Sequence, residues 1–176
     1  KVNGYAYLDI PDYTTISRRM RNLKIALKKQ RKEKVVLLVD STGLKVFGEG
    51  EWKVRKHGVD YRRTWKKLHI AVDTDGEVRS VIMSHSNDHD VRHAESLILQ
   101  EDTPVTTFCG DGAYDSTALH QLLEARGVEE VLIPPKKNSI VSEKNHHLRN
   151  AIIKQGKSTW KKESNYHQRS KAETHM

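Results

Sequence analysis

The chain has 176 residues, of which 31% are charged and 36% hydrophobic, and its 31 Lys and Arg against 23 Asp and Glu give a net charge of +8. This length is typical of one domain with a short appendage, and so basic a surface favours a polyanionic partner such as nucleic acid. We expect no membrane partner, because the longest tidy aliphatic run, Val35 to Val39, falls far short of the roughly 20 residues that cross a bilayer. A single cysteine, Cys109, excludes an internal disulfide and indicates a reducing compartment, so we expect a cytoplasmic protein.

Residues 1–34 are predicted to hold the end of an N-terminal helical DNA-binding region and a basic linker. Asp12 or Thr14 can cap a helix that carries Ile16 and Met20 on one face. Five Lys and Arg residues with a single Glu follow between positions 28 and 34. A structured domain then begins abruptly and covers residues 35–176. Because the chain starts with Lys and its last helical pattern has no C-cap signal, we expect a piece of a longer protein, truncated at its C-terminus.

The pattern of apolar residues predicts strands and helices that alternate along this domain. Short apolar or alternating runs predict strands at 35–39, 68–72, 78–83, 105–109 and 131–133. Helical periodicity predicts helices at 91–98 (capped by Asn87-Asp88), 119–125 (stopped by Gly127), 148–153, and from 160 onward. Asp73-Thr74-Asp75-Gly76 reads as a plain hairpin turn between the second and third strands. This order predicts an α/β fold, a mixed sheet with helices packed on its faces, and functional groups at the carboxyl ends of its strands.

Two carboxylates follow buried strands in this pattern. Asp40 ends the run 35–39, and Asp111 follows 105–109 between two glycines that permit close approach of a ligand or of backbone. A poorly solvated carboxylate is costly without a partner, and a divalent cation is a natural partner for several such oxygens. An Asp after a strand is also commonly a helix cap or a turn residue, so the pair by itself leaves both interpretations open.

A third polar group lies near the end of the sequence. On a helix of 100° per residue, Arg169 and Glu173 fall about 60° and 20° from Tyr166, so the three share one stripe. A solvated helix face has the same pattern. The stripe acquires a functional meaning only together with the two aspartates.

These three motifs, in this order, resemble those of the DDE transposases of bacterial insertion sequences, in their Tyr-x-x-Arg-x-x-x-Glu subgroup. The resemblance covers residues 35–176 and, more weakly, 9–24. It implies a ribonuclease-H-like fold with helices on both faces and a catalytic triad of Asp40, Asp111 and Glu173. It also implies metal-dependent DNA cleavage and strand transfer. A catalytically inactive DNA-binding relic of such an element, or another ribonuclease-H-like nuclease, remains the alternative.

The resemblance further implies the cofactors and partners. Two Mg²⁺ ions, replaceable by Mn²⁺, would be held by Asp40, Asp111 and Glu173. Tyr166 and Arg169 would hold phosphates near the transposon end. The partners would be double-stranded DNA of the transposon ends and of the target, and further copies of the chain in a homo-oligomer assembled on DNA. Such a protein would be bacterial and nucleoid-associated.

A basic segment from Trp52 to Lys67 is the strongest DNA-tracking candidate, because cations neutralise phosphates and interleaved aromatic rings stack on bases. Its cations are Lys53, Arg55, Lys56, Arg62, Arg63, Lys66 and Lys67. The alternative is a solvated loop whose tryptophans pack on the sheet. Zinc is not expected at His85, His89 and His93, since one Cys is too few for common structural sites, and His146-His147 is interpreted as a helix start.

Overall fold

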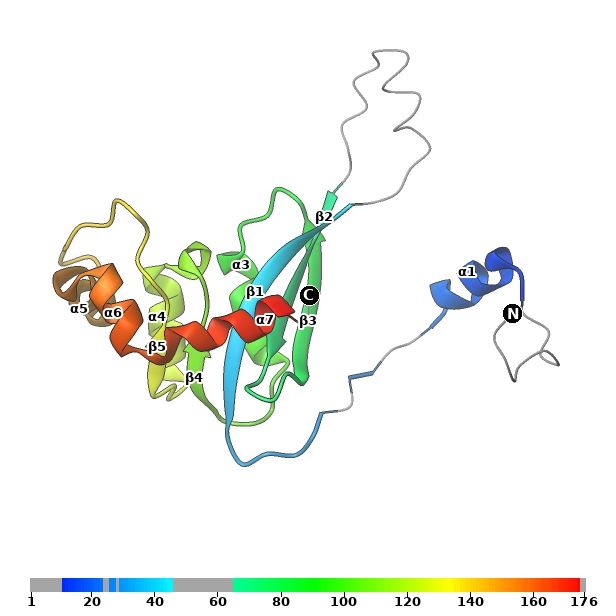
Figure 1. The fold of residues 1–176 in the computed structure, drawn as a ribbon, viewed down its shortest axis with the longest axis horizontal. Coiled ribbons are helices and arrows are strands. Elements are labelled where there is room, and N and C mark those ends of the chain that lie inside the picture. The colour runs from blue at the N-terminus through cyan, green and yellow to red at the C-terminus, as the bar shows by residue number, and fades with distance from the viewer. Residues whose placement is uncertain (1–10, 24–25, 28, 46–64, 175–176) are drawn as a thin grey trace, which may run out of the picture.

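The computed structural model describes residues 11–23, 26–27, 29–45 and 65–174, which form one five-stranded sheet with helices around it (Figure 1). The strands are β1 Val35–Lys45, β2 Trp65–Val72, β3 Val78–His85, β4 Val105–Cys109 and β5 Glu130–Leu132. Their order across the sheet is β3-β2-β1-β4-β5. β2 is antiparallel to both β1 and β3, whereas β4 runs parallel to both β1 and β5. The predicted α/β class, a ribonuclease-H-like mixed sheet, is confirmed.

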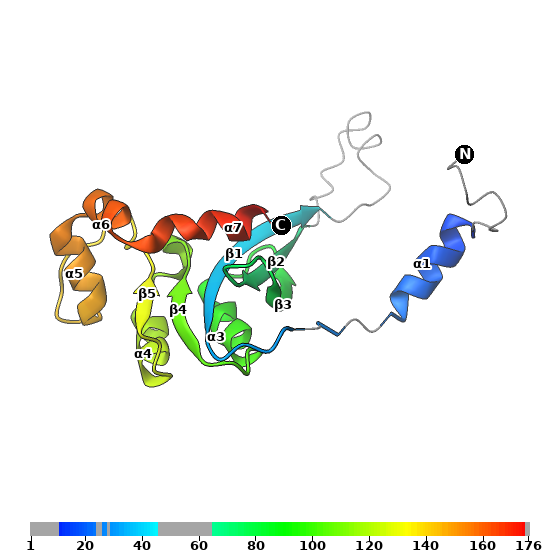
Figure 2. The same cartoon turned by 60° about the horizontal axis from the view of Figure 1, so that its bottom comes forward.

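Helices cover both faces of this sheet (Figures 1 and 2). Among the described residues they are α1 Tyr13–Arg21, α3 Val91–Leu99, α4 Thr117–Ala125, α5 His147–Gln155, α6 Lys157–Glu163 and α7 Ser170–Thr174, with 3₁₀ turns η1 Gly112–Tyr114 and η2 Asn165–Arg169. None of the helices in this part of the chain is long and apolar enough to cross a bilayer.

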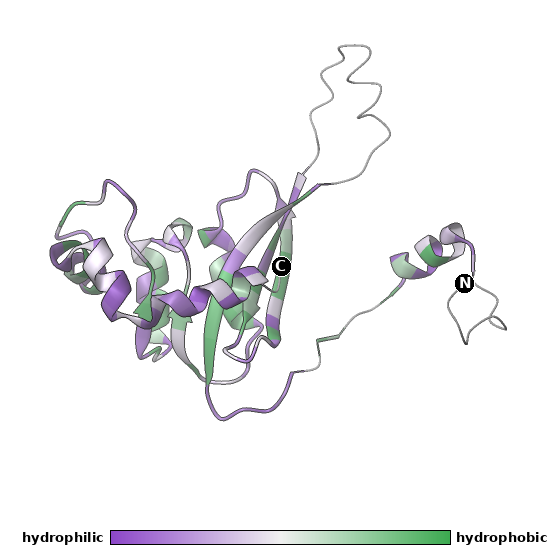
Figure 3. Ribbon diagram, in the orientation of Figure 1, coloured by the Kyte–Doolittle hydropathy of each residue, from purple (hydrophilic) through white to green (hydrophobic). Residues whose placement is uncertain are grey.

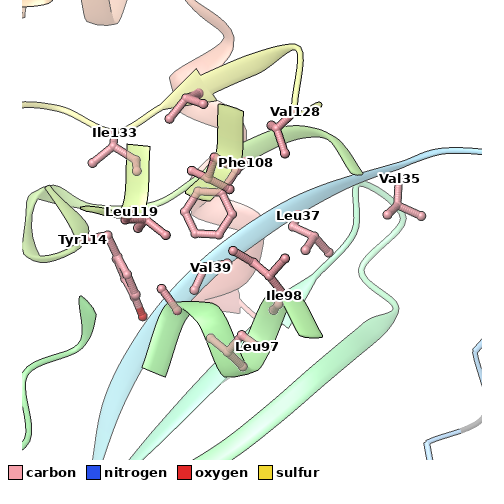
Figure 4. Packing of buried hydrophobic residues seen from close by; sticks show 14 residues of the cluster. Val35, Leu37, Val39, Leu97, Ile98, Phe108, Tyr114, Leu119, Val128 and Ile133 are labelled. Carbon is pink, nitrogen blue, oxygen red and sulfur yellow. The ribbon is translucent and has the colours of Figure 1, made fainter. Parts of the chain in front are cut away.

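The central strand β1 is apolar on both faces because each face has its own helical layer. Leu37 and Val39 join the larger core cluster, which α3 and α4 complete with residues such as Leu97 and Leu119 (Figure 4). Leu38, one residue out of phase, joins the second cluster on the opposite face. Ile152, Trp160 and Ala172 complete this second cluster from α5, α6 and α7. In Figure 3 the middle of the sheet is accordingly hydrophobic, while the outer sides of the helices are polar.

Several predicted elements differ from the structure in their bounds or in their caps. β1 continues past Val39 to Lys45, because β2 pairs with it from Leu38↔Val72 to Lys45↔Trp65. The hydrogen bonds of this ladder join backbone groups and do not depend on whether the side chains are apolar. The final predicted helix is divided into α6, η2 and α7. α3 begins after Asp90 and not after Asn87-Asp88, since the Asp88 carboxylate accepts from the backbone N–H of His85 instead.

The segment before β1 contacts the sheet, although the sequence suggested only a linker. Lys32 donates to Asp73 and Asp75 at the hairpin turn, each at 2.6 Å, and the backbone N–H of Gln30 donates to Glu77 at 2.6 Å. Asp73 thus behaves as the predicted turn residue. α1 is capped by the predicted Asp12, but none of its residues is buried and it stands apart from the sheet in both views (Figures 1 and 2). The division between 1–34 and 35–176 stays a prediction.

Candidate active site

Asp40 and Asp111 come from neighbouring parallel strands. The last paired residues of β1 and β4 are Leu38 and Cys109, and each aspartate lies two residues further along its chain. Both carboxylates therefore reach the same edge of the sheet. The prediction that Asp40 ends its strand is wrong, because Asp40 pairs opposite Ile70 in the continuing antiparallel ladder.

Asp111 has a structural role beside any chemical one. One of its carboxylate oxygens accepts from the backbone N–H of Ala113 at 2.8 Å, so it caps the 3₁₀ turn η1. The flanking glycines lie in close packing, where a larger residue would press on its neighbours. A Cβ at Gly110 would lie 3.1 Å from the Tyr114 ring, and one at Gly112 would lie 3.3 Å from the carbonyl oxygen of Pro134. The cap leaves the second carboxylate oxygen of Asp111 for other contacts.

The last helical segment brings Glu173 to this edge. Ala172 is fully buried in the second core cluster, and α7 packs on β1 and β2. Lys171 donates from Nζ to the Thr74 carbonyl oxygen at 2.6 Å, which fastens α7 to the hairpin turn. On the other side, Cys109 Sγ lies 3.9 Å from the Tyr166 carbonyl oxygen. Burial raises the pKa of the Cys109 thiol to about 12, so this cysteine is a core residue and no nucleophile.

Arg169 connects two of the three predicted carboxylates. Its Nη1 lies 2.9 Å from Asp40 Oδ2, and its Nη2 pairs with Glu173 Oε1. Its guanidinium carbon lies 5.9 Å from the centre of the Tyr166 ring. The predicted stripe of Tyr166, Arg169 and Glu173 is therefore present, with its first part in a 3₁₀ turn, where residues i and i+3 eclipse.

The charges of the other two carboxylates act on Asp40. Burial raises the pKa of Asp40, and the negative charges of Asp111 and Glu173 act in the same direction. The Ser41 N–H and the Arg169 guanidinium oppose this shift, but the net pKa of Asp40 is raised. Burial lowers the pKa of Arg169, yet Tyr166 and the two carboxylates outweigh burial and raise it. A metal cation at this edge, in addition to the Arg169 guanidinium, would reduce the repulsion of Asp40 by Asp111 and Glu173.

The donor set fits a hard divalent cation, because carboxylate oxygens are the ligands that Mg²⁺ and Mn²⁺ prefer. In the described part of the chain, the group of three ligand atoms that lie within 4.8 Å of one another consists of Glu124, His146 and His147. Asp40, Asp111 and Glu173 are thus spaced more widely than one ion bound by all three would require. Two ions that share Asp40 would not need Asp111 and Glu173 to be close.

The predicted basic segment lies mostly outside the described residues, which include none of Lys53, Arg55, Lys56, Arg62 and Arg63. Lys66 and Lys67 belong to β2, and both have partners. Lys66 Nζ is 3.3 Å from His85 Nδ1, and Lys67 Nζ is 2.7 Å from Asp90 Oδ1. Trp65 is the first residue of β2; its ring lies over Gly43, where a Cβ would be 3.3 Å away, and the residue is 39% exposed.

Two residues near the carboxylates were not predicted as part of the site. Tyr114 is fully buried, and its hydroxyl has no hydrogen-bond partner among the described residues. Burial raises the pKa of Tyr114, with further contributions from Asp90, Asp111 and Asp40, which places its hydroxyl near these groups. The sequence signal that could have placed Tyr114 near the site was its position three residues after Asp111. Asp90 had no such signal.

The sheet order and the two helical layers define the chain as a ribonuclease-H-like α/β domain. A family model described as "Transposase DDE domain" matches residues 31–176, and a second model with the same description matches residues 4–49. The chain belongs to the DDE transposase domain family. This family supports a transposase function with DNA as the substrate, and DDE transposases use divalent metal ions.

Proposed function

We propose that the chain is the catalytic domain of an insertion-sequence transposase of the Tyr-x-x-Arg-x-x-x-Glu subgroup, which cleaves DNA and transfers the freed strand to a target. The supporting observation is the Arg169 guanidinium between Asp40 and Glu173. Asp40 and Arg169 are 129 residues apart in sequence, and their contact joins the central strand to the 3₁₀ turn η2 that precedes the last helix. A solvated helix face would not explain this pairing.

Asp40, Asp111 and Glu173 are the proposed metal ligands. Asp40 lies on the central strand and would be shared between two ions, while Asp111 and Glu173 would each hold one. When bound, Mg²⁺ or Mn²⁺ supplies an activated oxygen nucleophile and stabilisation of the leaving oxygen. The one oxygen of Asp111 that caps η1 fixes the direction of the other.

Arg169 and Tyr166 are the proposed phosphate contacts. The Arg169 guanidinium is partly exposed and has five N–H donors, so it can hold the carboxylates and still donate to a phosphate oxygen. Tyr166 lies between Trp160, at 5.4 Å between ring centres, and Lys161 Nζ, at 4.8 Å from its ring. We further propose that the segment 52–67 follows the DNA backbone and that the active assembly is a homo-oligomer on DNA.

The test compares Glu173→Gln with the wild type on a labelled duplex that carries a transposon end, with Mg²⁺ or Mn²⁺. We expect cleavage to fall at least about 100-fold, because a metal ligand is lost, while DNA binding stays nearly unchanged. Glu143→Gln is the control, since Glu143 is also exposed and lies outside the carboxylate site. Cleavage by Glu173→Gln at the wild-type rate would refute the assignment. Binding without nicking by the wild type would favour the inactive relic.

A further inference from the structure

A second group of metal-ligand side chains lies between α4 and α5. Glu124 is in the last turn of α4, His146 is the N-cap of α5, and His147 is its first residue. One ligand atom from each of the three lies within 4.8 Å of the other two. None of these residues belongs to the proposed DNA-cleaving site.

His146 is the buried member of this group, with 7% of its surface exposed. Its Nε2 lies 3.0 Å from Glu124 Oε2, while its Nδ1 is buried and has no hydrogen-bond partner among the described residues. The centre of the His147 ring lies 4.3 Å from the centre of the His146 ring.

A third imidazole stands behind this group. His120 precedes Glu124 by one helical turn on α4, and its ring stacks on His146 at 5.2 Å with an angle of 14° between the planes. His120 is fully buried; its Nε2 lies 3.8 Å from the buried Asp115 Oδ1, and its Nδ1 has no hydrogen-bond partner among the described residues. Buried polar atoms of this kind are rare in folded proteins, because each forfeits its hydration. The N-terminus of a helix does not by itself require three neighbouring histidine rings.

We propose that Glu124, His146 and His147 bind one Zn²⁺-type cation that links α4 to α5. Two imidazoles and one carboxylate form a common three-ligand set for zinc, with water in the fourth position, whereas Mg²⁺ prefers oxygen ligands alone. In a tetrahedral site with bonds of about 2.0–2.1 Å, neighbouring ligand atoms are about 3.4 Å apart, close to the observed 3.0 Å between His146 and Glu124.

The consequence of such a link follows from its position. α5 leads directly into α6, η2 and α7, which carry Tyr166, Arg169 and Glu173. A cation between α4 and α5 would fasten the start of this C-terminal segment to the helix that follows β4. The inference does not depend on DNA cleavage, because the site shares no residue with the carboxylate cluster.

The test uses the 176-residue chain after removal of metal with EDTA, titrated with Zn²⁺ against a chromophoric chelator. We expect one ion per chain, and a loss of affinity of at least about 100-fold in both His147→Ala and Glu124→Gln. Both side chains are exposed, so both variants should fold. His89→Ala removes an exposed imidazole elsewhere and should bind Zn²⁺ as the wild type does. Asp40→Asn should also retain this ion, which separates it from the carboxylate site.

Thermal unfolding provides a second readout. A free Zn²⁺ concentration of 100 times Kd should raise the Tm of the wild type and of His89→Ala by about 5–10 °C, and should leave His147→Ala nearly unchanged. Absence of one-to-one binding by the wild type would overturn the proposal. Equal binding by the wild type, His147→Ala and Glu124→Gln would overturn it as well, and the group would then be an ordinary histidine–carboxylate pair.

Discussion

Replacing Glu101 by Gln is expected to destabilise the domain by about 3 kcal/mol at neutral pH, because it breaks a buried ion pair and leaves Arg79 with Glu77, at 2.9 Å, as its remaining carboxylate partner among the described residues. Arg79 donates to both carboxylate oxygens of Glu101, each at 2.8 Å, and both side chains are only 1% exposed. Arg79 also donates to the Gln30 carbonyl oxygen at 3.0 Å. This pair therefore joins β3, the connection after α3 and the segment before β1.

The same pair predicts a pH dependence whose sign follows from the pKa. Burial alone would raise the pKa of Glu101, but hydrogen bonds from Arg79 and Thr103 outweigh burial and lower it from 4.5 to about 2. A carboxyl group with a lowered pKa stabilises the folded state fully above its unfolded pKa and loses this contribution as pH falls. A shift of this size corresponds to about 3 kcal/mol, present above about pH 4.5 and lost towards pH 2.

Urea unfolding of the wild type and of Glu101→Gln at pH 7, 5, 4 and 3 measures both effects. The difference between the two proteins should shrink as pH falls below about 4.5. Glu129→Gln is the control, because Glu129 pairs with Lys34 at an exposed site and should contribute less than about 1 kcal/mol. A loss below about 1 kcal/mol in Glu101→Gln at pH 7, or a difference that does not vary with pH, would refute the reasoning.

Three further predictions concern the proposed site. Arg169→Ala should weaken binding of transposon-end DNA by about 1.5–3 kcal/mol in a gel-shift titration, and unchanged affinity would argue against a phosphate contact. Asp40→Asn and Asp111→Asn should each weaken Mg²⁺ or Mn²⁺ binding in calorimetry, and wild-type affinity in both would exclude a shared site. Lys67→Gln should change the dependence of log K on log salt only slightly, because Asp90 already pairs with that ammonium. A matched variant replaces Arg62, Arg63 and Lys66 by Gln. It should reduce the slope of log K against log salt by about 2.7, which is 0.9 for each lost phosphate contact, and an unchanged slope would place the DNA path elsewhere.

The local elements could be predicted from the sequence because their signals act over a few residues. The uninterrupted apolar run 35–39 specifies a strand buried on both faces, and both faces are indeed covered. The turn at Asp73–Gly76 and the helix stop at Gly127 depend on glycines with φ of +83° and +72°, a conformation that other residues rarely adopt. The order of these elements was enough to indicate a mixed sheet.

Only the tertiary structure decided which side chains meet. The polar end of β1, from Ser41 to Lys45, is a strand because β2 pairs with it in an antiparallel ladder. Arg169 contacts Asp40 because η2 and α7 pack on β1, and Glu124 contacts His146 because the fold brings the end of α4 to the N-cap of α5. Caps, turns and periodicity are set by neighbours along the chain, whereas ion pairs and ligand groups depend on packing between residues far apart in sequence.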